Sequence, residues 1–184
     1  MRLFIAMPLP GEIEEKLAEV IFTLKQTRTK VKWVAPKNIH LTLKFLGDTD
    51  EKLVPQISRA IEQTAEKYTA VDCSIDRLGA FPNLRRPRVF WAGLAGKVDT
   101  LAKIAGEIDS GMAEIGFEKE TRPFKSHLTL GRVKDNFKID ELTEAVEKYN
   151  FTPEDIVFNK IVLFKSTLTR QGPIYERLFE TGLK

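Results

Sequence analysis

Residues 39–46 read Ile39-His40-Leu41-Thr42-Leu43-Lys44-Phe45-Leu46, and apolar and polar side chains alternate over most of this stretch. Alternation with a period of two is typical of a β-strand that turns one face to a core and the other to solvent. We expect the polar face of this strand to carry His40, Thr42 and Lys44. The tetrapeptide His-Leu-Thr-Leu recurs at residues 127–130, so the chain contains two strands of this kind.

These two tetrapeptides hold both histidines of the chain, His40 in the first half and His127 in the second. Each histidine shares its strand face with the threonine two positions later, which is Thr42 or Thr129. Histidine is the side chain whose ordinary pKa best suits proton transfer near neutral pH. The duplicated pattern therefore favours a single site built from both halves of the chain, with an imidazole and a hydroxyl from each.

Two imidazoles that face one cleft provide what displacement at a phosphate requires, namely a base for the nucleophile and an acid for the leaving oxygen. Threonine hydroxyls can donate hydrogen bonds to the charged phosphoryl oxygens. This scheme needs neither a metal nor a cofactor. A two-histidine metal site is the alternative, but catalytic zinc usually has three protein ligands, and the sequence shows no Cys pair or His-x-x-Glu cluster.

The composition is that of an ordinary globular protein, with 42% hydrophobic and 30% charged residues among 184. A net charge of +3 permits an anionic partner but does not require one. No apolar run reaches the length of a membrane span, and the single cysteine, Cys73, fits a reducing compartment. We therefore expect a cytoplasmic protein without membrane contact, in which Cys73 is a small buried hydrophobe.

Short alternating strands and amphipathic helices follow one another along the whole chain. Strands are expected at residues 2–7, 31–34, 39–46, 71–78, 88–94, 124–132, 156–165 and 174–179. Helices are expected at residues 11–28, 50–67, 97–115 and 139–149, with Gly116 at the end of the third. This order indicates an α+β protein with mostly antiparallel sheet. We expect residues 1–184 to form one domain, in which the two halves of the chain pack as pseudo-symmetric lobes around a central cleft.

The ordered set of motifs resembles the two-histidine phosphoesterase superfamily. It is most similar to the RNA 2′,3′-cyclic phosphodiesterases of the LigT-like family, formerly called 2′-5′ RNA ligases. The resemblance covers nearly the whole chain, whereas a single His-x-Thr would be a poor signal. It rests on residues 3–6, 40–47, 81–82, 86–91, 124–132, 163–166 and 172–175.

The resemblance implies two lobes, each an antiparallel sheet with outer helices, and a metal-independent enzyme acting on RNA ends. The reaction implied is hydrolysis of a terminal 2′,3′-cyclic phosphate to a 2′-phosphate, in which the P–O3′ bond breaks. His40 would be the acid toward O3′ and His127 the base for water, although these two roles can be exchanged. Thr42 and Thr129 would hold the phosphoryl oxygens. Fragments of tRNA are candidate substrates, and no obligate protein partner is implied.

Arg132 follows His127 by five positions, where the family has an arginine near the phosphate or ribose. Simple alternation would place this odd offset on the opposite face, so we expect a bulge or a strand end at Gly131. An ordinary surface arginine is the alternative. Lys44 has the parity of His40, and it is a candidate either for an RNA backbone contact or for a solvated strand position.

Two further groups of residues are weaker candidates. Arg85, Arg86 and Arg88 form a basic loop that could contact additional phosphates, although charge runs are more often solvated. Phe45 and Trp91 could stack a terminal base. Their alternation with apolar neighbours favours core packing instead.

Three other functions fit the same residues. If the 5′-hydroxyl of a second RNA replaced water, the protein would be a 2′-5′ RNA ligase, although abundant water favours hydrolysis. A related enzyme could act on a small cyclic phosphate such as a nucleotide. The third possibility is an RNA-end-binding protein without turnover, which would not need two titratable rings. Substitution of His40 or His127 separates these classes, because a binding protein keeps its affinity whereas an enzyme loses mainly rate.

Overall fold

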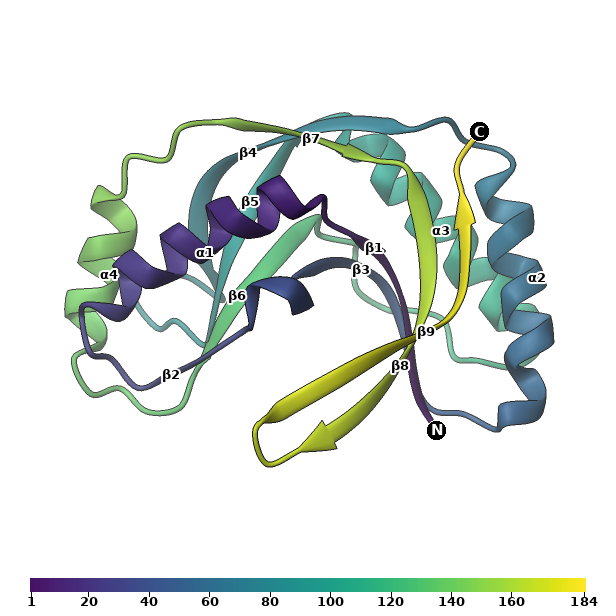
Figure 1. Cartoon of the computed structure of the whole chain (residues 1–184), viewed down its shortest axis with the longest axis horizontal. Coiled ribbons are helices and arrows are strands. Elements are labelled where there is room, and N and C mark those ends of the chain that lie inside the picture. The colour runs from purple at the N-terminus through teal and green to yellow at the C-terminus, as the bar shows by residue number, and fades with distance from the viewer.

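Two antiparallel sheets form the body of the computed structural model, which describes residues 1–184 (Figure 1). The first sheet has the strand order β3 (His40–Asp48), β1 (Arg2–Pro8), β8 (Lys160–Thr169) and β9 (Gly172–Gly182). The second has the order β2 (Val31–Trp33), β6 (His127–Val133), β5 (Val89–Gly96), β4 (Val71–Phe81) and β7 (Glu154–Phe158). This arrangement confirms the predicted α+β class with antiparallel sheets.

Helices cover the outside of both sheets (Figure 1). Helices α1 (Gly11–Lys25) and α4 (Ile139–Lys148) lie beside the second sheet, and α2 (Val54–Ala65) and α3 (Val98–Ile115) lie beside the first. Two short 3₁₀ helices, η1 (Pro36–Asn38) and η2 (Glu51–Leu53), lead into β3 and α2. Gly116 ends α3 as predicted, with a φ of +108° that glycine adopts without steric cost. None of the helices combines the length and apolar character needed to span a membrane.

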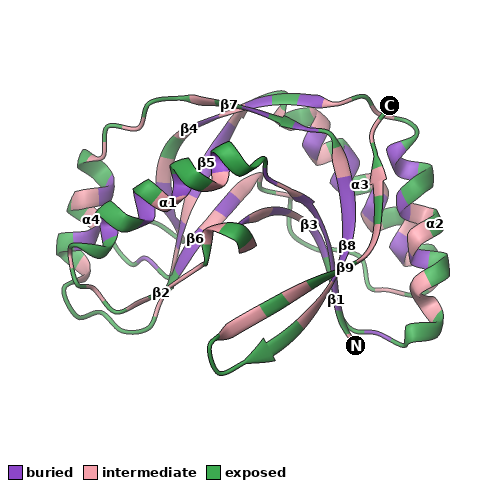
Figure 2. Cartoon of the chain, in the orientation of Figure 1, coloured by how far each residue is buried: buried purple, intermediate pink, exposed green.

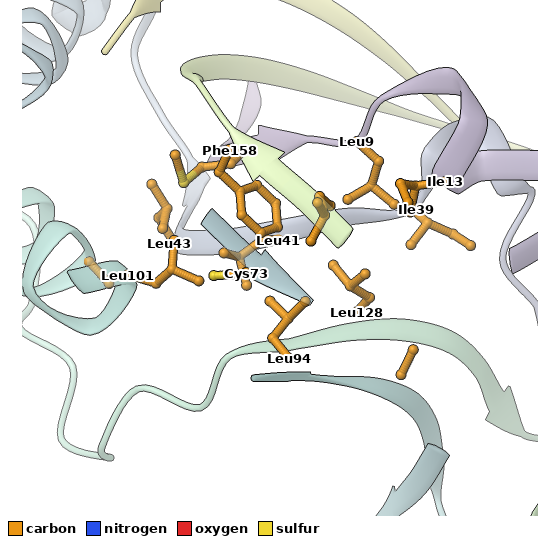
Figure 3. Packing of buried hydrophobic residues seen from close by; sticks show 14 of the residues in the cluster. Leu9, Ile13, Ile39, Leu41, Leu43, Cys73, Leu94, Leu101, Leu128 and Phe158 are labelled. Carbon is orange, nitrogen blue, oxygen red and sulfur yellow. The ribbon is translucent and has the colours of Figure 1, made fainter. Parts of the chain in front are cut away.

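A cluster of 36 buried hydrophobic residues extends through both sheets and their helices. Leu41 and Leu43 of β3 gather in it with Leu94 of β5 and Leu128 of β6 (Figure 3). Cys73 is also buried in this core, as predicted. Because the leucines of both tetrapeptides face the core, the histidines and threonines between them face away from it.

The two lobes are not the two halves of the chain, because β8 and β9 complete the sheet that begins with β1 and β3. The prediction of one strand over residues 156–165 is wrong. β7 ends at Phe158 and pairs with β4, whereas β8 begins at Lys160 and pairs with β1. Both strands are rich in apolar residues, so composition does not reveal that the chain changes sheets at Asn159.

Each histidine strand contains a β-bulge just after its threonine. In β3 the extra residue is Leu43, which has no partner in β1. In β6 the extra residue is Leu130, which has no partner in β5. After an extra residue, the side chains of the strand point to the face opposite to the one that simple alternation predicts. The position five residues after each histidine therefore returns to the face of that histidine.

These bulges determine which face of its strand each of three predicted residues occupies. In β6 the expected bulge is present, and Arg132 lines the cleft. The predictions that Lys44 shares the face of the first histidine and that Phe45 packs in the core are wrong. Lys44 is only 3% exposed, and its ammonium group donates to Oδ1 of Asp109 at 2.6 Å. Phe45 is 62% exposed and lines the cleft, at the position in β3 that corresponds to Arg132 in β6.

Candidate active site

A cleft of about 840 Å³ lies between the two lobes. Its lining includes all five residues that the sequence predicts for the site, which are His40, Thr42, His127, Thr129 and Arg132. The two tetrapeptides thus meet at one cleft although they belong to different sheets. One further wall comes from residues 166–175 of the β8–β9 hairpin, which projects from the body of the molecule (Figure 1). The far end of this hairpin is largely exposed (Figure 2).

His40 begins β3, and aromatic rings enclose its imidazole. Phe4 stacks on it with ring centroids 4.8 Å apart, and Tyr175 meets it edge-on at 5.6 Å. Its Nδ1 donates to the carbonyl of Asn38 at 2.8 Å, because a carbonyl oxygen can only accept. Nε2 is therefore the nitrogen left for a ligand. Burial lowers the pKa of His40 to about 4, so the ring is neutral at neutral pH.

His127 begins β6 in a matching arrangement. Its Nδ1 donates to the carbonyl of Lys125 at 2.7 Å, and Phe81 meets its ring edge-on at 4.9 Å. Burial lowers the pKa of His127 as well, and the nearby cations Arg132 and Lys125 lower it further. Both rings therefore offer Nε2 to the cleft, and cations lower the pKa of His127 but do not contribute to that of His40.

The residue two positions before each histidine accepts a hydrogen bond from the imidazole with its backbone carbonyl. Its side chain makes a second contact near the cleft. The amide of Asn38 donates to the carbonyl of Pro173 at 3.1 Å, on the hairpin that carries Tyr175. The ammonium of Lys125 lies 5.2 Å from the centre of the Phe81 ring. The two half-sites are thus built alike. Sequence reasoning missed these contacts, because Asn38 and Pro173 lie 135 positions apart and no local pattern joins them.

Thr42 and Thr129 follow the histidines on the same strand faces and line the cleft. Other threonine hydroxyls donate to backbone carbonyls, as those of Thr23 and Thr64 do within helices. The hydroxyls of Thr42 and Thr129 have no such partner in the protein. They are therefore free to donate to a ligand that enters between the histidines.

Unpaired cations line this cleft, and no carboxylate does. Arg132 of β6 lies directly opposite Lys32 of β2 in the sheet. Arg2 and Lys37 complete the four lysines and arginines of the lining, which contains no Asp or Glu. The cleft is therefore suited to an anion. Sequence reasoning missed Lys32 and Lys37, because they lie in short segments without a motif.

The family model described as LigT like Phosphoesterase matches residues 7–91 and 95–175. This chain belongs to the LigT-like phosphoesterase family. A relative named RNA 2′,3′-cyclic phosphodiesterase, from Methanocaldococcus jannaschii, is 37% identical and is aligned over 98% of this chain and 99% of its own. A relative of the same name from Thermotoga maritima is 32% identical over 98% of this chain and 94% of its own.

Solved structures of similar proteins have the same fold as this LigT-like phosphoesterase. A structure from Thermus thermophilus has a TM-score of 0.82 at 27% identity, covering 100% of this chain and 98% of that one. The structure of E. coli LigT complexed with 3′-AMP has a TM-score of 0.75 at 26% identity, covering 99% and 97%. The comparisons confirm the predicted family and identify the chain as a hydrolase.

The remaining candidates from the sequence lie outside the cleft of this LigT-like phosphoesterase. The basic loop with Arg85, Arg86 and Arg88 contributes no residue to the lining. Trp91 also lies outside it and packs against Phe81, with ring centroids 5.3 Å apart. No three His, Cys, Asp or Glu side chains lie close enough together to hold a metal ion.

Proposed function

We propose that this LigT-like phosphoesterase opens the 2′,3′-cyclic phosphate at the end of an RNA and leaves a 2′-phosphate. One observation carries the proposal. Two imidazoles, each with Nδ1 bonded to a backbone carbonyl, share a cleft that has four cations and no carboxylate. Such a pair can serve as acid and base for displacement at an anionic phosphate. The names of the relatives from M. jannaschii and T. maritima support the choice of substrate.

In the proposed reaction a water molecule attacks phosphorus and the P–O3′ bond breaks. Nε2 of His127 accepts a proton from the water, while Nε2 of His40 donates a proton to O3′. Thr42 and Thr129 donate hydrogen bonds to the non-bridging oxygens, and Arg132 balances their charge. The product carries a 2′-phosphate and a 3′-hydroxyl, and proton exchange with solvent restores both rings. The step uses no metal ion.

The surroundings of the two rings support this division of roles. Burial lowers the pKa of His127, and the charges of Arg132 and Lys125 lower it further, which keeps this ring in the free-base form that a general base needs. Burial lowers the pKa of His40, and no cation contributes. A bound phosphate offsets the effect of burial, because a negative charge favours the protonated ring. Protonation of His40 is therefore coupled to the arrival of the substrate.

The test is incubation of the purified protein, in excess EDTA, with a short RNA that ends in a 2′,3′-cyclic phosphate. Wild type is compared with His40→Ala and His127→Ala, and the product end is identified. A 2′-phosphate that forms with the wild type alone supports the proposal. A 3′-phosphate product, or undiminished turnover in either variant, contradicts it. RNA bound equally by all three proteins without turnover would indicate an end-binding protein, and a joined 2′-5′ product would indicate a ligase.

A further inference from the structure

Lys32 and Arg132 occupy directly opposite positions on the neighbouring antiparallel strands β2 and β6. Two like charges in this arrangement repel each other and destabilise a sheet. Neither side chain is neutralised by a carboxylate, and the cleft that both of them line has none. Lys30 differs in this respect, because its ammonium lies 3.0 Å from Asp135. A bound anion is the simplest group that would relieve the repulsion between Lys32 and Arg132.

The position of this pair in the sheet separates it from the reacting phosphate. A strand rises about 3.3 Å per residue, so four effective steps along β6 place the Cα of Arg132 roughly 13 Å from the Cα of His127. The guanidinium of Arg132 is long enough to reach back toward Thr129. Lys32 starts from the adjacent edge strand, farther from Thr129 than Arg132. Lys32 is therefore suited to a second anion on the same ligand.

We propose that Lys32 binds a second phosphate, the 5′-phosphate of the nucleotide whose 2′,3′-cyclic phosphate reacts. The identity of this ligand rests on the proposed function. In such a nucleotide one ribose separates the two phosphates. The cyclic phosphate can therefore lie at the His127 end of the polar face of β6 while the 5′-phosphate lies at the Arg132 end. Arg132 lies between the two phosphate positions, where it contributes to both. The subsite recognises a phosphate group and not a base.

The size and lining of the cleft agree with this ligand. A volume of about 840 Å³ is near the upper end of the range for pockets that enclose whole small molecules. An isolated cyclic phosphate would leave most of it empty. The lining also includes the exposed apolar side chains of Phe45, Leu168 and Ile174, which come from β3 and the β8–β9 hairpin and not from the strands of Lys32 and Arg132. A nucleoside can lie against these side chains while its two phosphates face His127 and Lys32.

This subsite would select nucleic-acid ends over small cyclic nucleotides. The last nucleotide of an RNA always carries a phosphodiester at its 5′ position, whereas adenosine 2′,3′-cyclic phosphate carries none. A charge-assisted contact to phosphate contributes about tenfold in affinity. We therefore expect the 5′-phosphate alone, without a second nucleoside, to improve binding by about this factor.

The test compares the affinities of two product analogues by titration calorimetry, adenosine 2′-phosphate and adenosine 2′,5′-bisphosphate. The proteins are wild type, Lys32→Ala and the matched control Lys30→Ala. Lys30 lies two positions away, has its charge paired with Asp135 and does not line the cleft. We expect the bisphosphate to bind about tenfold more tightly to wild type and Lys30→Ala, and this preference to fall below about twofold in Lys32→Ala.

Equal affinity of the two analogues for wild type would overturn the subsite, and so would a preference that survives in Lys32→Ala or a failure of both analogues to bind. A second measurement separates this inference from the proposed function. It is the turnover of adenosine 2′,3′-cyclic phosphate with and without a 5′-phosphate. If wild type hydrolyses neither compound nor the RNA, the proposed function fails. A bisphosphate preference that depends on Lys32 would still support the second phosphate site.

Discussion

Asn38 and Pro173 are joined by a hydrogen bond of 3.1 Å between the side-chain amide of one and the carbonyl of the other. The carbonyl of the same asparagine accepts the proton on Nδ1 of His40. One residue thus links the first imidazole to the β8–β9 hairpin, whose Tyr175 lies edge-on against that ring. The orientation and burial of His40 therefore depend on a hairpin that follows it in sequence by more than a hundred residues.

Asn38→Ala removes the bond to the hairpin but leaves the backbone carbonyl in place. We expect Tyr175 to shield His40 less, so that the lowered pKa of His40 moves back toward 6.5. Histidine-selective NMR measures this directly, because the chain has only two histidines. The signals of His127 should not change.

Gln26→Ala is the control for Asn38→Ala. It removes an amide donor that also bonds a carbonyl at 3.1 Å, that of Phe22 at the end of α1. We expect both histidine pKa values to remain as in wild type. A His40 that titrates identically in Asn38→Ala and wild type would contradict the proposed link between the hairpin and the ring.

The pH dependence of kcat/KM follows from the two lowered pKa values. His127 must be neutral, so the rate falls as pH drops below its pKa, and His40 must be protonated, so the rate falls as pH rises above its pKa. Both values lie below the ordinary 6.5 in the free protein. We expect a bell-shaped profile with its maximum below pH 6.5. A maximum above pH 7, or a flat profile, would contradict the assigned roles.

Stability should also depend on pH through His40. The unfolded chain takes up a proton on this histidine near pH 6.5, whereas the folded protein does so only near 4. The folded state therefore loses stability as pH falls through this window, by up to about 3 kcal/mol. In His40→Gln we expect a smaller loss between pH 7 and pH 4.5, measured by urea unfolding. An unchanged pH dependence would show that His40 is not buried as described.

Lys44→Met tests the finding that Lys44 forms a buried ion pair and does not line the cleft. The carboxylate of Asp109, whose side chain is 18% exposed, would lose its cation and keep only the backbone N–H of Glu120, so we expect a loss of about 2–4 kcal/mol in unfolding free energy. The double variant Lys44→Met/Asp109→Leu should recover most of this loss. The folded variant should bind RNA with the affinity of wild type. A clear drop in affinity would indicate that Lys44 contacts RNA in the cleft.

The sequence predicted the faces of the two histidine strands well, because alternation is a local property. It predicted the position of Arg132 because Gly131 indicated a bulge. A Cβ at Gly131 would lie 2.6 Å from Val31 of β2, so the close approach of that strand requires glycine here. No comparable signal marks Leu43, an ordinary member of an alternating run. The bulge there exists only in the pairing with β1, which is why Phe45 was assigned to the wrong face.

The contacts that the sequence did not predict are those between distant segments. Three of these features depend on which strands become neighbours. They are the position of Lys32 opposite Arg132, the hydrogen bond from Asn38 to Pro173 and the change of sheet at Asn159. Local periodicity predicts that a strand forms and which face is apolar, but not its partner. The roles of Asn38 and Lys125 beside the histidines, and the proposed subsite at Lys32, could therefore be found only in the structure.

The most direct test of the central claim is a comparison of kcat, in EDTA and on RNA with a 2′,3′-cyclic end, among wild type, His40→Ala, His127→Ala and the double variant. If the two rings act as acid and base in one step, each single variant should lose at least about a hundredfold in kcat. The double variant should lose little more, because effects of groups that act as a unit are not additive. A single variant that stays within about tenfold of wild type would contradict catalysis by this pair.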